Sequence, residues 1–278
     1  MKAELVADAR AQLGEGPLWD ARTEELLWVD ILAGVVHRFD PATHADRTFD
    51  AGSYVGAVVP RAAAGYALAV AAGFALASDS GEVTPLVAVR HGDAVRMNDG
   101  ACDSGGRFWA GSMRLDESHG GGSLYRLDPD HTLETICTGV TISNGIAWSP
   151  DDTLLYYVDT PTMAIDVFDF DAATGAATDR RVLLRVEGPG SPDGLNVDVE
   201  GGLWVAFWGG GRVRRYSPQG ALELEIEVAA AHTTKAAFGG RELTDLYITT
   251  AEGEEPNAGG LYVVQPGIAG LPARAFAG

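Results

Sequence analysis

A strand pattern recurs six times along this chain of 278 residues. Each copy begins with a short, mostly apolar segment, and further short segments rich in Val, Leu, Tyr and Trp follow it. The four clear copies begin at Gly16, Gly100, Gly145 and Gly194, and the two weaker copies begin at Gly56 and Lys235. The repeat length is about 40–47 residues, which is the period of a four-stranded propeller blade.

Turn residues separate these segments. Asp, Pro, Gly and Asn bound each predicted strand, as in residues 128–130 and 149–152. No window combines an amphipathic helical period with caps at both ends, so very little helix is expected. We therefore predict an all-β fold, a six-bladed β-propeller with four-stranded antiparallel blades in one domain over residues 1–278. Residues 2–9 are expected to close the ring by pairing with strands from the C-terminal end.

The charge balance argues against several partners. The formal net charge is −19, and lysine occurs only at Lys2 and Lys235. A chain this acidic repels nucleic acid and anionic membranes. The N-terminus lacks the apolar run of a signal peptide, and no stretch approaches the ~20 apolar residues of a membrane span. We expect a cytoplasmic protein, monomeric or weakly homo-oligomeric, with Cys102 and Cys137 as free thiols in buried strands.

The residue before each blade's first strand segment shows the most informative pattern. In blade order this position holds Glu15, Val55, Asp99, Asn144, Asp193 and Thr234. Because the first strand of a propeller blade lines the central channel, these side chains are expected to meet near the axis. Three carboxylates in a desolvated channel are costly unless a cation neutralises them. Oxygen donors favour Ca²⁺, Mg²⁺ or Mn²⁺, and Zn²⁺ or Fe²⁺ with several waters remains open.

Each Asn-Gly or Asp-Gly pair taken alone could instead be a turn, because both are strong turn formers. The six histidines offer no rival metal site, since they are scattered without metal-ligand spacing. The chain has no His-Glu-x-x-His, EF-hand, Walker or Gly-x-Ser-x-Gly motif. Serine or cysteine nucleophilic catalysis is therefore disfavoured. Trp208 is expected near the mouth of the pocket; the aromatics expected in the core between blades are Trp19, Trp28, Trp109, Trp148 and Trp204.

The ordered motifs resemble the SMP-30/gluconolactonase/regucalcin family of six-bladed propellers, over essentially the whole chain. The motifs that carry the resemblance are Leu-Gly-Glu-Gly-Pro at 13–17, Arg-Met-Asn-Asp-Gly at 96–100, Trp-Ala-Gly-Ser-Met at 109–113, Ile-Ser-Asn-Gly at 142–145, Pro-Asp-Gly at 192–194 and Phe-Gly-Gly at 238–240. The resemblance implies one divalent ion held by Glu15, Asn144 and Asp193, with water or substrate at the remaining positions. Ca²⁺ is the first candidate.

The resemblance also implies a substrate site. Arg96 and Asn98 would bind a sugar lactone, and a further acidic contact falls on Asp116. Here Asp116-Glu117 replaces a pair of glutamates, so either carboxylate could reach the substrate. Asp99 would be a metal ligand, or would orient Asn144 or a water on the metal. The loop 117–122 is short and Gly-rich, so the cover over the pocket could differ from that of relatives.

The leading hypothesis is a metal-dependent hydrolase that opens sugar lactones to aldonic acids. The cation would polarise the carbonyl and activate a water, with Asp193 as general base. Arg96 and Asn98 would hold the ring hydroxyls and the developing oxyanion. Two alternatives remain: a calcium-binding regulatory protein that uses the same ligands without turnover, and a metal-dependent esterase or phosphotriesterase.

Overall fold

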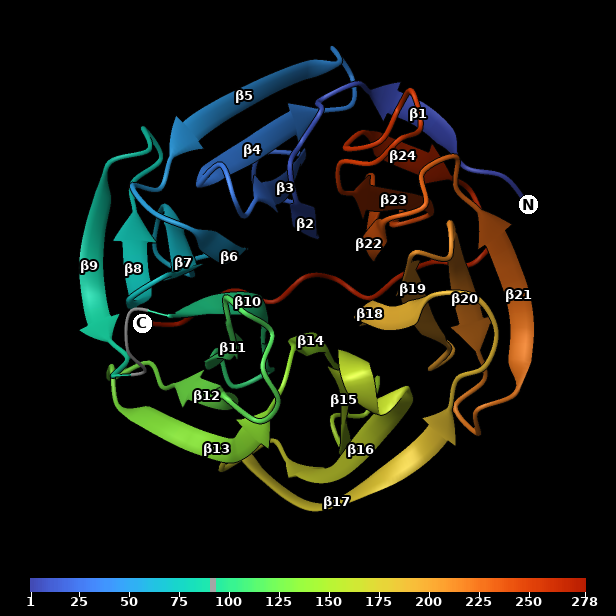
Figure 1. The fold of residues 1–278 in the computed structure, drawn as a ribbon. Helices are drawn as coiled ribbons and strands as arrows, with labels where there is room; N and C mark the ends of the chain where they lie inside the picture. Colours follow the sequence, from blue (N-terminus) through green and yellow to red (C-terminus); the bar gives the residue numbers. More distant parts are fainter. Residues whose placement is uncertain (91–93) are drawn as a thin grey trace.

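Six β-sheets form a ring around a central axis (Figure 1). The computed structural model describes residues 1–90 and 94–278. In these residues every sheet has four antiparallel strands, and the one helical element is the 3-10 turn η1 (Thr160–Thr162). The predicted six-bladed β-propeller, with four-stranded antiparallel blades and very little helix, is confirmed.

Each of the first five blades consists of four consecutive strands, the first of which lies nearest the axis (Figure 1). The strands of blades 1 to 3 are β2 (Gly14–Asp20), β3 (Glu25–Asp30), β4 (Val35–Asp40), β5 (Ala45–Asp50), β6 (Val55–Pro60), β7 (Tyr66–Val70), β8 (Gly73–Ala77), β9 (Val83–Ala88), β10 (Val95–Cys102), β11 (Phe108–Arg114), β12 (Gly122–Leu127) and β13 (Leu133–Val140). The strands of blades 4 and 5 are β14 (Ser143–Trp148), β15 (Leu154–Asp159), β16 (Ala164–Asp171), β17 (Ala176–Arg185), β18 (Ser191–Val197), β19 (Leu203–Trp208), β20 (Arg212–Tyr216) and β21 (Leu222–Glu227).

Blade 6 combines the two ends of the chain. From the axis outwards its strands are β22 (Thr233–Gly239), β23 (Asp245–Thr250), β24 (Leu261–Val264) and β1 (Glu4–Ala7). The N-terminal strand β1 pairs antiparallel with β24, so the predicted closure of the ring by residues 2–9 is confirmed. Lys2 also forms a bridge with Glu227, at the end of the outer strand of blade 5.

The innermost strand of every blade is irregular at the same point. Its pairing shifts register between Glu15 and Leu18, Val55 and Ala57, Met97 and Gly100, Asn144 and Ile146, Pro192 and Leu195, and Thr233 and Lys235. Such bulges bend a strand and redirect side chains, and they are common next to active sites. The six irregularities confirm the alignment of blades predicted from the sequence. They also show that the Asp-Gly and Asn-Gly pairs lie inside strands rather than in hairpin turns.

The core lies between neighbouring blades. All five tryptophans predicted there are buried. Two of them donate their indole N–H to an aspartate at or just beyond the end of an inner strand: Trp109 to Asp103 at 2.9 Å and Trp204 to Asp198 at 2.8 Å. The aspartate that ends the repeated segment therefore anchors the next strand of its own blade, far from the site described below.

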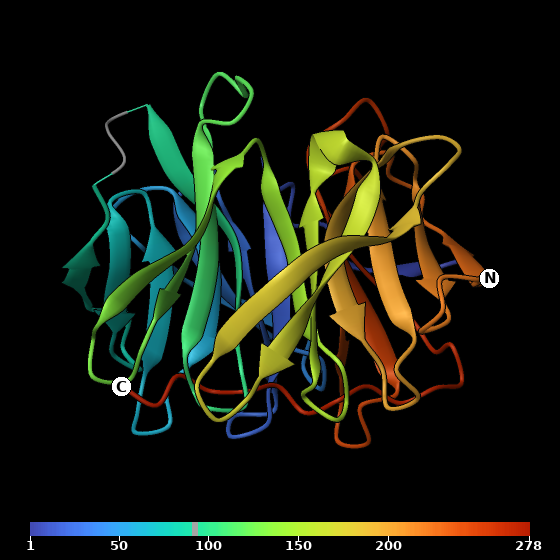
Figure 2. The same cartoon turned by 90° about the horizontal axis from the view of Figure 1, so that it is seen from below.

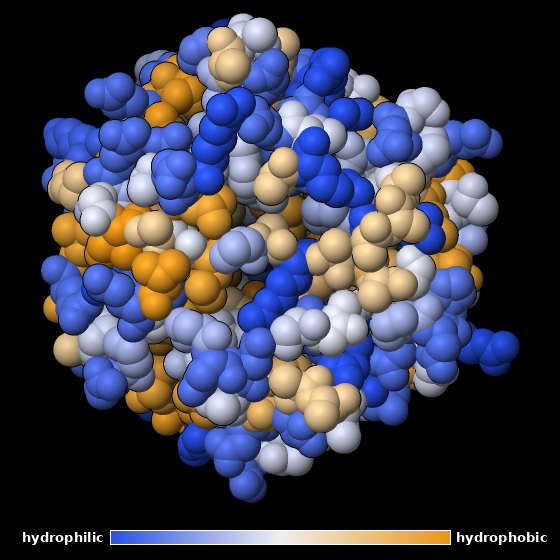
Figure 3. All heavy atoms as spheres, turned by 180° about the vertical axis from the view of Figure 1, so that it is seen from behind, coloured by the Kyte–Doolittle hydropathy of each residue, from blue (hydrophilic) through white to orange (hydrophobic). Residues whose placement is uncertain are grey.

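The C-terminal tail (residues 265–278) crosses the lower face of the ring, at the bottom of Figure 2. Backbone hydrogen bonds hold it at both sides, from Gly270 N to Leu243 O and from Phe276 N to Pro60 O, each at 2.8 Å. Residues 271–274 line a cavity of about 110 Å³ at the lower end of the channel. Side chains cover the centre of the ring on this face (Figure 3). The repeat pattern did not predict this tail.

Two smaller expectations can be compared with the structure. Both cysteines are free thiols; Cys102 is buried in β10, whereas Cys137 is only half-buried. The prediction of burial is wrong for Cys137 because β13 is the outermost strand of its blade. Within residues 1–90 and 94–278, no helix is long and apolar enough to span a membrane.

Candidate active site

The bulges direct a group of polar side chains into the upper half of the channel, the half opposite the C-terminal tail. Glu15, Asn144 and Asp193, the three predicted metal ligands, are each only 4–5% exposed. Asn144 and Asp193 lie on adjacent inner strands, since a Cβ placed on Gly145 would be 3.0 Å from the Asp193 carbonyl oxygen. These residues come from three blades, as the repeat predicted.

Glu15 and Asp193 form a buried acidic pair. Burial, followed by repulsion from Asp99, raises the pKa of Glu15 to about 7. Burial is also the main cause that raises the pKa of Asp193 well above its ordinary value, and the charges of Glu15 and Asp99 add to it. A hydrogen bond with the Glu15 carboxyl acts in the same direction on Asp193. In the absence of a cation, the pair therefore tends to hold a proton.

Asp99 has a different partner. The Lys235 ammonium contacts Asp99 Oδ1 at 2.5 Å, and both side chains are almost completely buried. Asp99 Oδ1 also accepts the Gly100 N–H at 2.7 Å. Its other oxygen, Oδ2, is buried and has no hydrogen-bond partner within the described part of the chain. The hydrogen bonds of the Asn144 side chain go to Asn98 and Thr160 and not to Asp99. A role of Asp99 as a metal ligand, or in orienting a water on the metal, stays a prediction.

Asn98 orients Asn144 instead. Its Nδ2 donates to Asn144 Oδ1 at 2.9 Å and to the Ser143 carbonyl at 2.7 Å. Its own Oδ1 accepts a hydrogen bond from Arg96 at 2.5 Å. The Asn144 Nδ2 in turn donates to Thr160 Oγ1 at 2.8 Å, so the orientation of the Asn144 amide is fixed from both ends.

Arg96 carries positive charge to the rim of this group. Its side chain is only 6% exposed, and burial lowers the pKa of its guanidinium to about 10, so it remains charged at neutral pH. Glu15, Glu117 and Asp193 lie close enough to oppose that shift electrostatically. Arg96 also lines the pocket above the channel, where it can meet a bound molecule.

The donor set fits a hard divalent cation. Among the residues that the structure describes, nothing forms a hydrogen bond with the buried Asp193 Oδ1, which leaves a carboxyl oxygen free to coordinate. Among residues 1–90 and 94–278, no three His, Cys, Asp or Glu side chains are arranged to hold a metal by themselves. A metal held by Glu15 and Asp193 would need further ligands, and the Asn144 amide oxygen remains the predicted third one. His91 lies outside the described residues.

A pocket of about 600 Å³ opens above this group on the upper face. Apolar and polar side chains share its wall; those lining it include Leu32, Arg96, Met113, Leu115, Glu117, Trp208, His232 and Glu252. Trp208 lies at the mouth, as predicted, and stacks on His232 with ring centroids 4.2 Å apart and planes at 9°. The stacked rings offer a flat surface at the mouth of the pocket.

The two acidic residues after β11 point to different places. Asp116 is exposed, and Arg114 binds its carboxylate through Nε at 2.9 Å, which holds the pKa of that carboxyl well below its usual range. Glu117 lines the pocket instead and adopts a left-handed backbone conformation, with φ 55°. Residues held in such conformations often occur at functional sites. Glu117 is thus the better placed of the two to meet a ligand.

The repeat pattern did not indicate the roles of three residues. In the sequence Lys235 stands out as one of two lysines and as the start of a weak repeat, without a role. His232 is one of six scattered histidines, and Thr160 does not stand out at all. The position of Lys235 directly after the axial residue of blade 6 was a usable signal. No local pattern marks His232 or Thr160, because each acts through a partner elsewhere in the sequence.

Comparison with known proteins identifies the family. The model of the family described as "SMP-30/Gluconolactonase/LRE-like region" matches residues 13–252. The chain belongs to the SMP-30/gluconolactonase family. The resemblance proposed from the motifs is thereby confirmed.

Relatives within the SMP-30/gluconolactonase family align along their whole length. "Putative sugar lactone lactonase YvrE" of Bacillus subtilis (strain 168) is 38% identical over 291 residues, covering 100% of this chain and 99% of that protein. Regucalcin of Danio rerio is 35% identical over 292 residues, with the same coverage. Among solved structures, a calcium-binding protein, regucalcin, from Agrobacterium tumefaciens strain C58 has a TM-score of 0.94 at 26% identity, covering 99% of this chain and 97% of that one.

Proposed function

We propose that this protein is a hydrolase that opens sugar lactones with the help of one divalent cation held by Glu15, Asn144 and Asp193. The observation that carries the proposal is the unpartnered, buried Asp193 Oδ1 in an acidic group below an open pocket. Membership of a family that includes a relative named as a lactone lactonase supports the choice of substrate. A bound cation of this kind supplies Lewis acidity, which polarises a lactone carbonyl and makes a nearby water more acidic.

The residues of this chain would supply the base, the stabilisation of negative charge and the positioning of the ligands. Asp193 would accept the proton of the attacking water through its carboxylate. Arg96 faces the pocket with a fixed positive charge and stabilises negative charge on the lactone oxygen. Asn98 would hold the amide of Asn144 in place through its Nδ2, and its Oδ1 keeps a second lone pair with which it could accept a hydrogen bond from a ring hydroxyl.

The pocket wall would hold the rest of the substrate. Glu117 can accept hydrogen bonds from sugar hydroxyls, and the stacked Trp208 and His232 can cover one face of a ring. A sugar ring presents C–H groups on its faces and hydroxyls on its edge, which matches a wall of mixed polarity.

One experiment tests the proposal. The metal content of the untreated protein is measured by elemental analysis, and hydrolysis is then assayed on a panel of aldonolactones, a simple carboxylic ester and a phosphotriester. The panel is repeated after EDTA treatment and after addition of Ca²⁺, Mg²⁺, Mn²⁺ or Zn²⁺. We expect lactone opening that EDTA abolishes and one of these ions restores.

Variants connect the activity to the site. Asp193→Ala is expected to abolish turnover. The matched control is Asp169→Ala; Asp169 is an exposed aspartate that pairs with the surface residue Arg181, and its replacement should leave the rate unchanged. Full activity in Asp193→Ala would refute the assignment. Metal binding with no lactone opened anywhere in the panel would favour a calcium-binding protein without turnover.

A further inference from the structure

Lysine 235 occupies a position that glycine holds in every other blade. The residue that follows the axial position is Gly16, Gly56, Gly100, Gly145, Gly194 and Lys235 in blade order. The register shift in β22 falls immediately before Lys235, as the shifts in the other inner strands fall at their axial residues. Five blades therefore leave this position without a side chain, and the sixth places a long cationic side chain there.

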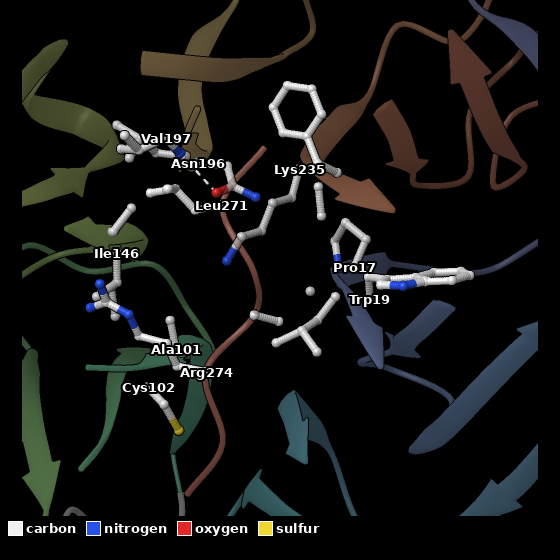
Figure 4. A pocket seen from close by; sticks show the side chains of 18 of the residues that line it. Pro17, Trp19, Ala101, Cys102, Ile146, Asn196, Val197, Lys235, Leu271 and Arg274 are labelled. Atoms are coloured by element: carbon white, nitrogen blue, oxygen red, sulfur yellow. Dashed lines mark hydrogen bonds between the residues drawn. The ribbon is translucent and has the colours of Figure 1, made fainter. Parts of the chain in front are cut away.

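The glycine of the neighbouring blade makes room for this lysine. A Cβ added to Gly194 would lie 2.4 Å from both Cβ and Cγ of Lys235. The aliphatic stem of Lys235 thus runs across the surface of β18 where no side chain projects. Figure 4 shows the side chain extending inward from the ring towards the centre of the channel. Its ammonium then meets Asp99 Oδ1, on a strand of a different blade.

The ammonium also acts on the two acidic ligands. Lys235 favours the charged forms of both Glu15 and Asp193, so its positive charge reaches all three channel carboxylates. Lys2, the other lysine of the chain, lies on the surface with 80% of its side chain exposed. Burial of one of only two lysines beside an acidic group is therefore a specific feature of this channel.

We propose that Lys235 is an internal counter-cation. Its ammonium pairs with Asp99 and thereby lowers the affinity with which Glu15, Asn144 and Asp193 bind a divalent cation. This inference rests on the metal site of the proposed function. The ion pair engages Oδ1 of Asp99 and offsets the negative charge of this carboxylate, and the ammonium repels a divalent ion nearby. Because oxygen-ligand sites set their affinity through the number of charged ligands, the pair keeps binding weaker than three free carboxylates would.

The test measures metal affinity directly. Calorimetric titration with Ca²⁺ alone, and separately with Mn²⁺ alone, is carried out on the EDTA-treated full chain. Lys235→Met is expected to bind each ion about tenfold or more tightly, because Asp99 is released and the repulsion is lost. Asp99→Asn is expected to bind about tenfold more weakly, because the ammonium then stays without its partner. The double variant should return to within about threefold of the wild type, since both charges are removed together.

Controls make the outcomes distinct. Lys2→Met is the same substitution at the other lysine and should leave affinity unchanged. The inference is overturned if Lys235→Met binds the ion as the wild type does or more weakly, or if Asp99→Asn binds it more tightly. The titration of Asp99→Asn still tests the inference if Lys235→Met does not fold. If the metal affinities of the variants change as expected but the protein opens no lactone, the inference is supported and the proposed hydrolase function is refuted. If neither the wild type nor any variant binds a divalent ion, both proposals fail.

Discussion

Asn98 donates its side-chain N–H to the amide oxygen of Asn144 at 2.9 Å, across the boundary between blades 3 and 4. This contact joins the Arg-x-Asn-Asp-Gly motif to the predicted metal ligand set. A side chain that orients a metal ligand can affect metal affinity almost as strongly as the ligand itself. We therefore propose that Asn98 positions Asn144; the lactone contact that the family resemblance implies for Asn98 stays a prediction.

Removal of this positioning contact should weaken metal binding. Asn98→Ala frees the Asn144 amide to rotate, and we expect about a 10–100-fold loss of divalent-cation affinity. Asn196→Ala is a matched control on an inner strand, because Asn196 lines the lower cavity instead. Calorimetric titration with Ca²⁺ would measure both. Equal affinity in Asn98→Ala and wild type would contradict the positioning role.

The metal-free protein should lose stability as the pH rises. The pKa of Glu15 is about 7 in the folded state against an ordinary value of 4.5, so the folded protein binds more protons than the unfolded chain between these values. The free energy of unfolding therefore falls across that range, by an amount on the order of 3 kcal/mol from this group. Urea denaturation of EDTA-treated protein at pH 5 and pH 8 would measure it.

Glu15→Gln provides the comparison for this pH effect. The variant lacks the titrating group, so its unfolding free energy should fall less between the two pH values. Addition of a divalent ion at pH 8 should stabilise the wild type more than the variant. Identical pH profiles for the two proteins would show that Glu15 does not titrate in this range.

Glu117 and Asp116 should differ in their effect on substrate. Glu117 lines the pocket, whereas Asp116 is exposed and bound by Arg114. We expect Glu117→Gln to raise KM for a sugar lactone about tenfold, through loss of hydrogen bonds from the carboxylate to hydroxyls. Asp116→Asn should change KM by less than about twofold. Steady-state kinetics would compare them, and the reverse order would return the substrate contact to Asp116.

Asp198 should matter for stability and not for metal binding. It is fully buried and accepts hydrogen bonds from Trp204 Nε1 at 2.8 Å and Arg215 Nε at 2.7 Å. Asp198→Ala removes the buried partner of both groups, at a cost of about 3 kcal/mol in the free energy of unfolding. Glu200→Ala removes an exposed partner of the same arginine and should cost less than about 1 kcal/mol. Urea denaturation measures both, and equal losses would contradict the structural role.

The sequence predicted what symmetry dictates. Because each blade repeats one strand pattern, alignment of the repeats was enough to predict the fold, the closure by β1 and the position of Glu15, Asn144 and Asp193 in the channel. The same reasoning treated Asp99 as equivalent to Asn144. It could not show that Lys235 captures Asp99, because that contact joins residues 136 positions apart.

Features that depend on tertiary contacts lay outside the repeat. The stack of Trp208 on His232 brings together the last residue of β19 and the residue just before β22, and nothing near either residue in the sequence indicates the other. The path of residues 265–278 is fixed by backbone hydrogen bonds to distant strands, which carry no residue signature. Which of Asp116 and Glu117 lines the pocket depends on the backbone conformation of the turn after β11, and the residue types alone did not indicate that conformation.

The tail and the side chains around it cover the centre of the lower face, whereas the pocket lined by Trp208 and Glu117 opens on the upper face. If the protein opens lactones as we propose, the substrate would enter and the acid product would leave through this upper pocket. A carboxylate product that stayed in the pocket would then compete with the next lactone for the same space.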